Sequence, residues 1–406
     1  MQPKTIKTID QIFGQPICIA LTIIRLLTGW FIKRKPVQNR KIVFIKLIEQ
    51  GATVLAYSSI KRAVELVGRE HVYFCVFKEN RPILDIIGLI PKENVFEIRQ
   101  GNIFLFIYDV ITFLLKSRMK GIDSTIDMEF FSRASAILAY LSGARNRVGL
   151  HRFNSEQPYR GDLLTHRVQY NPYLHTAKAY MLLIKALEAD MQQKPMLKVP
   201  VVDLIVEAPV FSPSEEELNK VQRLLNEKFG NNKPASLVLL NPNASDMLPL
   251  RKWDSKNFVE LGRKILETYP KSGLVLTGAP SEQLACNQLK MDFNDNRVIA
   301  VAGETTLREL LVLYTLSSLL ITNDSGPGHF ASMTTMPAIV LFGPETPELF
   351  GPLLDRVEVI WKGLACSPCV NPFNHRFSPC TNNLCMQAIS VEEVFEKVKK
   401  RSVIAS

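Results

Sequence analysis

Short apolar runs alternate with longer segments of helical periodicity along most of the chain. Within residues 41–150, apolar runs bounded by Gly, Pro or Asn predict five strands, over 41–46, 71–77, 94–98, 121–127 and 147–150. Helical periodicity predicts helices between them, over 52–67, 80–88, 102–119 and 132–142. This alternation is typical of an α/β fold with a parallel sheet and crossover helices.

The same alternation resumes in the second half of the chain. Strands are predicted over 236–241, 273–278, 297–301, 319–322, 338–343 and 357–360, with helices near 255–268, 282–290, 306–317 and 327–335. The intervening region 190–235 is punctuated by proline before a helix for which we predict Ser212 as N-cap. We therefore predict two doubly wound domains, 37–205 and 206–406, with a ligand cleft between them at the carboxyl ends of the strands.

The first 36 residues form a separate segment with a strongly apolar stretch at 17–32. Arg25 interrupts this stretch, which is shorter than the roughly 20 residues that span a bilayer. On a helical wheel one side carries Cys18, Thr22, Arg25 and Gly29. The pattern predicts an amphipathic helix lying in a membrane interface, and packing on the chain's own body is the alternative.

Positive charge follows the apolar stretch without an intervening acid. The residues are Lys33, Arg34, Lys35, Arg40, Lys41 and Lys46. We expect them to face anionic headgroups and, if the helix spans the membrane, to keep the rest of the chain in the cytoplasm. The helix at 101–118 is apolar nearly all round, which is typical of core and also compatible with a second membrane contact.

The amino-acid composition limits the classes of protein to which the chain can belong. With 406 residues, 47% hydrophobic and 22% charged, the chain has globular composition and is long enough for two or three domains. The net charge of +10 favours anionic partners. No helix-turn-helix signature or basic pattern interleaved with aromatics is present, so we expect no nucleic acid partner.

The most informative segment follows the strand predicted at 319–322. A tight turn leads into a helix, whose free N–H groups and dipole favour phosphate. The residues of this turn and first helical turn are Asp324, Ser325, Gly326, Pro327 and His329. Gly343 and Thr346 repeat the arrangement after the next strand. A purely structural strand–helix turn is the alternative interpretation.

These motifs resemble glycosyltransferase family 9, the bacterial heptosyltransferase family. The matching positions are Asp324, Ser325, Gly326, Pro327, His329, Ala331, Pro337, Phe342, Gly343 and Pro344. Similarity extends to 241–253, 277–283 and 45–51, and covers about residues 41–395. The resemblance implies a GT-B fold of two Rossmann-like domains, the first binding the acceptor and the second the donor.

The resemblance also implies chemistry and location. It implies a nucleotide-diphosphate sugar donor, inverting transfer to a lipopolysaccharide-core, lipid-linked or other envelope acceptor, and no cofactor for catalysis. The expected place of action is the cytoplasmic face of the inner membrane. Further donor-binding residues are expected in the matched loops: Asn243, Ser245, Arg251, Lys252 and Glu282. The charged ones could equally be solvated surface residues.

The first loop departs from the family pattern. Family members carry an Asp after its glycine as the general base, whereas Gly51 is followed here by Ala52. Candidate replacements are Asp127, Glu129 and Glu49, because an inverting displacement needs a base near the acceptor hydroxyl. For the first two, capping of the next helix or pairing with Arg133 is the alternative. The change also raises the hypothesis of a non-catalytic nucleotide-sugar-binding scaffold, and a two-domain sugar-nucleotide epimerase, which shares the architecture, is a further alternative.

Two further clusters stand out. Residues 145–167 hold five arginines, among which Arg152 and Arg160 are, with Gly51, our candidates for binding an acidic acceptor; a solvated loop is the alternative. Four of the seven cysteines lie within twenty residues: Cys366, Cys369, Cys380 and Cys385. Their spacing is compatible with structural zinc, with His375 as a spare ligand, with free thiols, or with disulfides.

Overall fold

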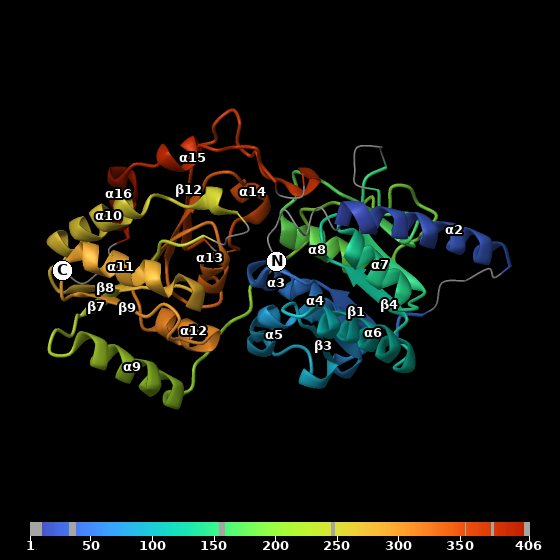
Figure 1. The fold of residues 1–406 in the computed structure, drawn as a ribbon, viewed down its shortest axis with the longest axis horizontal. Helices are drawn as coiled ribbons and strands as arrows, with labels where there is room; N and C mark the ends of the chain where they lie inside the picture. The colour runs from blue at the N-terminus through green and yellow to red at the C-terminus, as the bar shows by residue number, and fades with distance from the viewer. Residues whose placement is uncertain are drawn as a thin grey trace. The chain divides into compact units, whose positions relative to one another are not determined.

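The computed structural model describes residues 10–31, 38–153, 159–244, 248–353, 355–374 and 377–401. The chain divides into two compact units (Figure 1). Unit 1 runs to Glu207 and includes a return segment that begins at Pro372. Unit 2 runs from Ala208 to Asn371 and resumes at Phe377. The predicted cleft between two domains stays a prediction.

Unit 1 is built on a six-stranded parallel sheet with strand order β3-β2-β1-β4-β5-β6. The strands are β1 Ile42–Ile45, β2 Val72–Phe77, β3 Val95–Ile98, β4 Ser124–Asp127, β5 Asn146–His151 and β6 His166–Gln169. The first five were predicted, and β6 was not. In the central pair, Ile45 lies opposite Asp127, so the chain leaves β1 and β4 at the same edge of the sheet.

Helices cover the sheet of unit 1. They are α2 Gln15–Phe31, α3 Gln50–Leu55, α4 Tyr57–Val67, α5 Arg81–Ile87, α6 Ile103–Met119, α7 Arg133–Leu141 and α8 Thr176–Lys185. The single helix predicted over 52–67 is two helices that meet at Ala56. No element was predicted where α8 lies, and a short π-helix, Asp10–Gly14, precedes α2.

Unit 2 repeats this topology in the order β12-β11-β10-β7-β8-β9. Its strands are β7 Ser236–Asn241, β8 Ser272–Leu276, β9 Val298–Ala300, β10 Leu319–Asn323, β11 Ala338–Phe342 and β12 Val357–Trp361. Its helices are α9 Glu215–Phe229, α10 Ser255–Thr268, α11 Gln283–Phe293, α12 Leu307–Thr315, α13 Gly326–Ala331, α14 Pro347–Phe350, α15 Leu384–Gln387 and α16 Val391–Lys400. The strand order reverses beside β7 and β10, where ligands of doubly wound folds bind.

The start of α9 differs from the prediction. Its N-cap is Ser214 rather than Ser212, because the Ser214 hydroxyl accepts from the backbone N–H of Glu217 at 3.3 Å. The Glu217 carboxylate accepts from the Ser214 N–H at 2.9 Å and completes a capping box.

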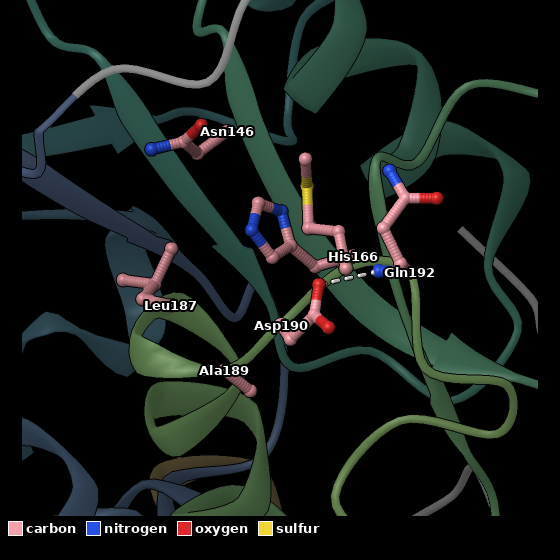
Figure 2. A pocket seen from close by; sticks show the side chains of 7 residues that line it. Asn146, His166, Leu187, Ala189, Asp190 and Gln192 are labelled. Atoms are coloured by element: carbon pink, nitrogen blue, oxygen red, sulfur yellow. Dashed lines mark hydrogen bonds between the residues drawn. The ribbon is translucent and has the colours of Figure 1, made fainter.

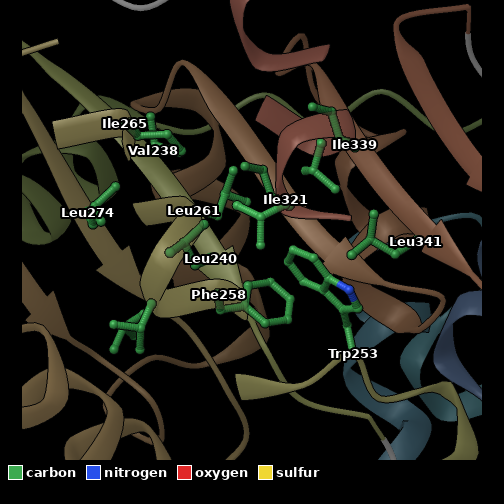
Figure 3. Packing of buried hydrophobic residues seen from close by; sticks show 14 of the residues in the cluster. Val238, Leu240, Trp253, Phe258, Leu261, Ile265, Leu274, Ile321, Ile339 and Leu341 are labelled. Carbon is green, nitrogen blue, oxygen red and sulfur yellow. The ribbon is translucent and has the colours of Figure 1, made fainter. Parts of the chain in front are cut away.

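Trp253 anchors the core of unit 2, where strands and α10 pack together (Figure 3). Its ring is fully buried and lies edge-on to Phe258, with centroids 5.0 Å apart. The indole N–H donates to the carbonyl of Ile389 at 2.9 Å, which satisfies its polar atom. The tryptophan thereby holds the backbone next to Arg251 and Lys252 against the core.

Among the described residues, no helix combines the length and apolar character needed to cross a membrane. The helix α2 packs on unit 1 through its polar stripe. Cys18 is buried in a cluster with Ala136 and Leu163, and the Thr22 hydroxyl accepts from the N–H of Asp162 at 2.9 Å. Arg25 forms an ion pair with the Asp162 carboxylate.

Candidate functional site

In unit 1, charged side chains gather where β1 and β4 end. Lys46 follows β1 directly, and its ammonium lies 3.0 Å from the Glu129 carboxylate and 3.3 Å from that of Glu49. The Lys46 side chain is fully withdrawn from solvent. Our prediction that Lys46 faces membrane headgroups is therefore wrong, because two carboxylates hold its charge inside unit 1.

Glu129 holds the loop after β1. Besides Lys46, its carboxylate accepts from the backbone N–H groups of Leu47 at 2.7 Å and Ile48 at 3.2 Å. Pairing with Arg133, the alternative considered from the sequence, does not occur, since Arg133 pairs with Asp10 and donates to the carbonyl of Tyr159. These bonds occupy both oxygens of Glu129.

Asp127, the last residue of β4, is completely buried. Its carboxylate lies 3.3 Å from the guanidinium of Arg160 and accepts from the N–H of Glu129 at 3.0 Å. Burial raises the pKa of Asp127 to about 6, although Arg160 opposes the shift. Arg160, expected at the acceptor, is itself buried, while Arg152 lies over the Phe373 ring at 4.1 Å.

Glu49 differs from the two buried acids. Its side chain is 23% exposed, and its backbone has a φ of 72°, a conformation that costs a non-glycine residue about 1–3 kcal/mol. It forms the N-cap of α3, in which Gly51 is buried and Ala52 follows. Of the three candidate bases, only Glu49 combines solvent access with a position in the first loop.

In unit 2 an arginine and two acids meet at the carboxyl ends of β10 and β11. The Nε of Arg251 lies 3.4 Å from Oδ2 of Asp324, and another guanidinium nitrogen pairs with Glu345. Both carboxylates are nearly completely buried. Glu345 was missed by sequence reasoning, although its place in the turn after β11, beside the predicted Gly343 and Thr346, was an available signal.

The buried surroundings of this cluster favour a bound proton on one of its two acids. Burial raises the pKa of Glu345 to about 8, and the guanidinium of Arg251 opposes the shift. Burial also raises the pKa of Asp324. Because two buried acids share one cation, the pair retains a proton at neutral pH.

Amide side chains connect the loops around this cluster. The Asn323 amide donates to the carbonyls of Pro242 and Asn243, both at 3.1 Å, and its oxygen accepts from the N–H of Trp253 at 3.1 Å. Asn243, a predicted donor-binding residue, donates to the Thr277 carbonyl at 3.2 Å. The turns after β7, β8 and β10 are therefore tied together. Asn323 was also missed from the sequence.

The predicted turn after β10 forms as expected. Ser325 is the N-cap of α13, which begins Gly326-Pro327, and its hydroxyl donates to the carbonyl of Asn323 at 3.1 Å. His329 is buried within the same helix.

The remaining residues predicted to bind the sugar donor lie in different environments. Lys252 is exposed, and Ser245 lies outside the described residues. The Glu282 carboxylate accepts from the N–H of Ala279 at 2.7 Å, and the Thr346 hydroxyl caps α14. Gly343 lies against Met386, so that a Cβ atom there would clash with the methionine sulfur.

No disulfide joins any of the seven cysteines. Among the described residues, no group of three or more potential ligands is placed to hold a metal. The Cys369 sulfur is instead a neighbour of the Ser378 hydroxyl at 3.1 Å, and Cys385 is buried beside Gly343. The disulfide interpretation is therefore wrong for these four residues, and structural zinc stays a prediction; His375 lies outside the described residues.

A pocket of about 320 Å³ opens elsewhere in unit 1 (Figure 2). Its lining residues are Asn146, His166, Leu187, Ala189, Asp190, Met191 and Gln192. Asn146 and His166 begin β5 and β6, so the pocket lies at the amino ends of these strands. Burial lowers the pKa of His166 to about 4, which leaves it neutral. The pocket lies at the sheet edge opposite the charged cluster and is a weaker candidate site.

Comparison with known proteins agrees with the observed fold. The profile described as Glycosyltransferase family 9 (heptosyltransferase) matches residues 115–375. The chain is 26% identical over 166 residues to lipooligosaccharide heptosyltransferase 2 of Campylobacter jejuni, covering 40% of this chain and 50% of that protein. It thus spans about half the length of the first curated relatives it matches.

Two solved structures share the fold. One is the ADP-heptose LPS heptosyltransferase II of E. coli, with a TM-score of 0.66 and 19% identity, covering 89% of this chain and 98% of that one. The other is a glycosyl transferase family 9 protein from Veillonella parvula, with a TM-score of 0.67 and 17% identity, covering 91% and 99%. At these identities the likeness shows the fold.

Proposed function

The chain belongs to glycosyltransferase family 9, and from this premise we propose that it is an inverting glycosyltransferase of envelope glycan synthesis. The donor is ADP-heptose or a similar nucleotide-diphosphate sugar, and the acceptor is a lipopolysaccharide core or a related lipid-linked glycan. The names of the similar heptosyltransferases support heptose as the sugar, ADP as the nucleotide of the donor and lipopolysaccharide as the acceptor.

The observation that carries this proposal is the cluster of Arg251, Asp324 and Glu345 at the carboxyl ends of β10 and β11. Transfer from a nucleotide-diphosphate sugar builds negative charge on the departing diphosphate, which a fixed guanidinium stabilises. Two carboxylates hold Arg251 in place, and the protonated acid keeps the cluster from repelling an anion. The turn that begins α13 at Gly326 lies directly after β10, next to Asp324.

For unit 1 we propose Glu49 as the general base. Its partial exposure and its place in the first loop, three residues before the Ala52 that stands where family members carry Asp, support this role. The buried ammonium of Lys46 lies 3.3 Å away and positions the carboxylate. Asp127 and Glu129 are positioning residues in this scheme, since Arg160, Lys46 and backbone N–H groups occupy them.

A lipid-linked acceptor requires the enzyme to work at a membrane surface. We propose that the chain acts at the cytoplasmic face of the inner membrane as a peripheral protein. Apolar side chains on the exposed side of α2 support this association.

The experiment is a transfer assay with the purified full chain, ADP-heptose and a lipopolysaccharide acceptor with a truncated core. We expect the acceptor to gain the mass of one heptose, with inverted anomeric configuration by NMR, and no gain with the Asp324→Asn variant. Donor binding without transfer to any acceptor would favour the scaffold hypothesis, for which Ala52 is the supporting observation. Isomerisation of the donor without acceptor would identify an epimerase. Either result would overturn the proposed transfer.

A further inference from the structure

The helix α2 packs on unit 1 through its polar side and exposes its apolar side, the reverse of a typical helix in a soluble protein. Small and polar residues at helical spacing face the body of unit 1: Gly14 at the end of the preceding π-helix, and Cys18, Thr22 and Arg25 of α2. The opposite side exposes six large apolar residues of α2, Ile17, Ile19, Ile23, Ile24, Leu26 and Leu27, and two of the π-helix, Ile12 and Phe13. A helix of a soluble protein normally buries its apolar face, so this side lacks its partner within the described chain.

The helix α6 shows the same imbalance. It buries Asp109, Phe113 and Ser117 on the sheet, and half-buries Phe106 and Val110. Its outer side exposes Ile103, Phe104, Leu105, Ile107, Tyr108, Ile111, Leu115 and Met119. Phe104 is 79% exposed and Met119 85%. Large apolar patches of this kind mark sites of association.

Both helices belong to one layer of unit 1, with α7 between them (Figure 1). From α7, Ala136 packs in the cluster that includes Cys18 of α2. Leu138 and Ala139 of α7 pack in the cluster that includes Phe113 of α6. The exposed sides of α2 and α6 therefore flank the same helix on the same face of the sheet.

The charges around this layer are complementary to an anionic surface. Among the described residues 10–31 and 38–41, the bases are Arg25, Arg40 and Lys41, and Asp10 is the single acid. That acid is neutralised by Arg133, and the only acid of α6, Asp109, accepts three hydrogen bonds from Arg99 at 2.7–3.0 Å. The last turn of α6 carries the bases Lys116 and Arg118. Apolar faces with adjacent bases and no free acid are typical of interfacial membrane helices.

We propose that the exposed sides of α2 and α6 together form a docking surface for an anionic lipid bilayer. The two helices lie in the interface of the bilayer without crossing the membrane. Each helix is a separate point of attachment. The inference extends the proposed function, because it identifies the surface that would hold unit 1 against a lipid-linked acceptor. Its test uses neither sugar donor nor glycan acceptor, so that a failed flotation leaves the proposed transfer reaction standing, and a failed transfer assay leaves the membrane surface standing.

The test is flotation of the purified full chain with vesicles of phosphatidylcholine mixed with phosphatidylglycerol, and with phosphatidylcholine alone. Wild-type protein is expected to float with the anionic vesicles, and more weakly in high salt or with neutral vesicles. Two double variants, Ile23→Asn/Leu27→Asn on α2 and Ile107→Asn/Ile111→Asn on α6, should each lower the partition coefficient about tenfold or more.

The matched control is Leu284→Asn/Met291→Asn, which changes two exposed apolar residues on α11 of unit 2 and should float like the wild type. An unchanged melting temperature will show that a variant folds. If the α6 double variant does not fold, Phe104→Asn is the substitute variant of that helix. The proposal is overturned if the wild type floats with neither vesicle, or if the α2 and α6 variants float as well as the control. Loss of a stable dimer in the variants, without vesicle binding by the wild type, would assign the surface to a second copy instead.

Discussion

The ammonium of Lys46 lies 3.0 Å from a carboxylate oxygen of Glu129, and neither side chain has appreciable contact with solvent. The two residues are 83 positions apart and meet because β1 and β4 are neighbours in the sheet of unit 1. A buried pair of this kind costs desolvation, which its hydrogen bonds offset. Here those bonds also fix the loop that contains Glu49.

Removing one member of this pair should destabilise the protein. We expect Lys46→Met to lower the free energy of unfolding by about 3–5 kcal/mol, because it leaves a buried carboxylate without its cation. The double variant Lys46→Met/Glu129→Gln should lose less than the sum of the single variants, as measured by urea unfolding. Lys252→Met, at an exposed lysine, is the control. Simple additivity would show that the pair is not coupled.

Changing Glu49 should affect turnover more than stability. If Glu49 is the general base, Glu49→Gln lowers kcat about 10²–10⁴-fold while KM for the donor and the melting temperature stay near wild type. The control is Glu79→Gln, which alters an exposed acid of unit 1. Steady-state kinetics with ADP-heptose would check this prediction. A kcat equal to that of the control would exclude Glu49 as the base.

Asp324 should control donor binding. Asp324→Asn removes one of the two acids that share Arg251, so Glu345 remains as the partner of the guanidinium and the fold should persist. Loss of a charged hydrogen-bond acceptor for the donor should raise its Kd about 10–100-fold, measurable by titration calorimetry. Glu267→Gln, on the exposed side of α10, provides the control. Tight binding by the Asp324 variant would show that this carboxylate does not contact the donor.

Glu345 should make stability depend on pH. Its pKa is raised from the ordinary value of 4.5 to about 8, so between these values the native state holds a proton that the unfolded state releases. The contribution of Glu345 to stability therefore falls as pH rises through this window and levels off above about pH 8. The free energy of unfolding of Glu345→Gln, minus that of wild type, should increase from pH 4.5 to 8 in urea titrations. A difference independent of pH would contradict the raised pKa.

Gly343 should be required for packing. Gly343→Ala places a methyl group against the sulfur of Met386, within van der Waals contact distance of Cys385 as well. We expect a loss of about 1–3 kcal/mol, as in other overpacked cores. Combining it with Met386→Ala should cost less than the sum of the two, since the smaller side chain makes room. Gly101→Ala, with no heavy atom near the added methyl, should be close to neutral in the same thermal melts.

The fold was largely predictable from local patterns. Central parallel strands are buried on both faces, so they appear as continuous apolar runs; the strand predicted at 236–241 coincides with β7. The edge strand β6 has the polar sequence HRVQ and gave no such signal. The shift of the α9 cap from Ser212 to Ser214 shows that the ends of elements depend on hydrogen bonds that nearby serines compete to make.

The sequence alone determined the two α/β units, the turn after β10 and the family resemblance, because these features depend on residues close together along the chain. Only the tertiary structure decided that Lys46 is internal, that Glu345 joins Arg251, and that no disulfide joins the four clustered cysteines. Each of these outcomes depends on which strand ends become neighbours in a sheet or on where a side chain points. A charged group or a thiol contacts its partner only when segments distant in the sequence come together. The residues next to it in the sequence therefore do not predict which group that partner is.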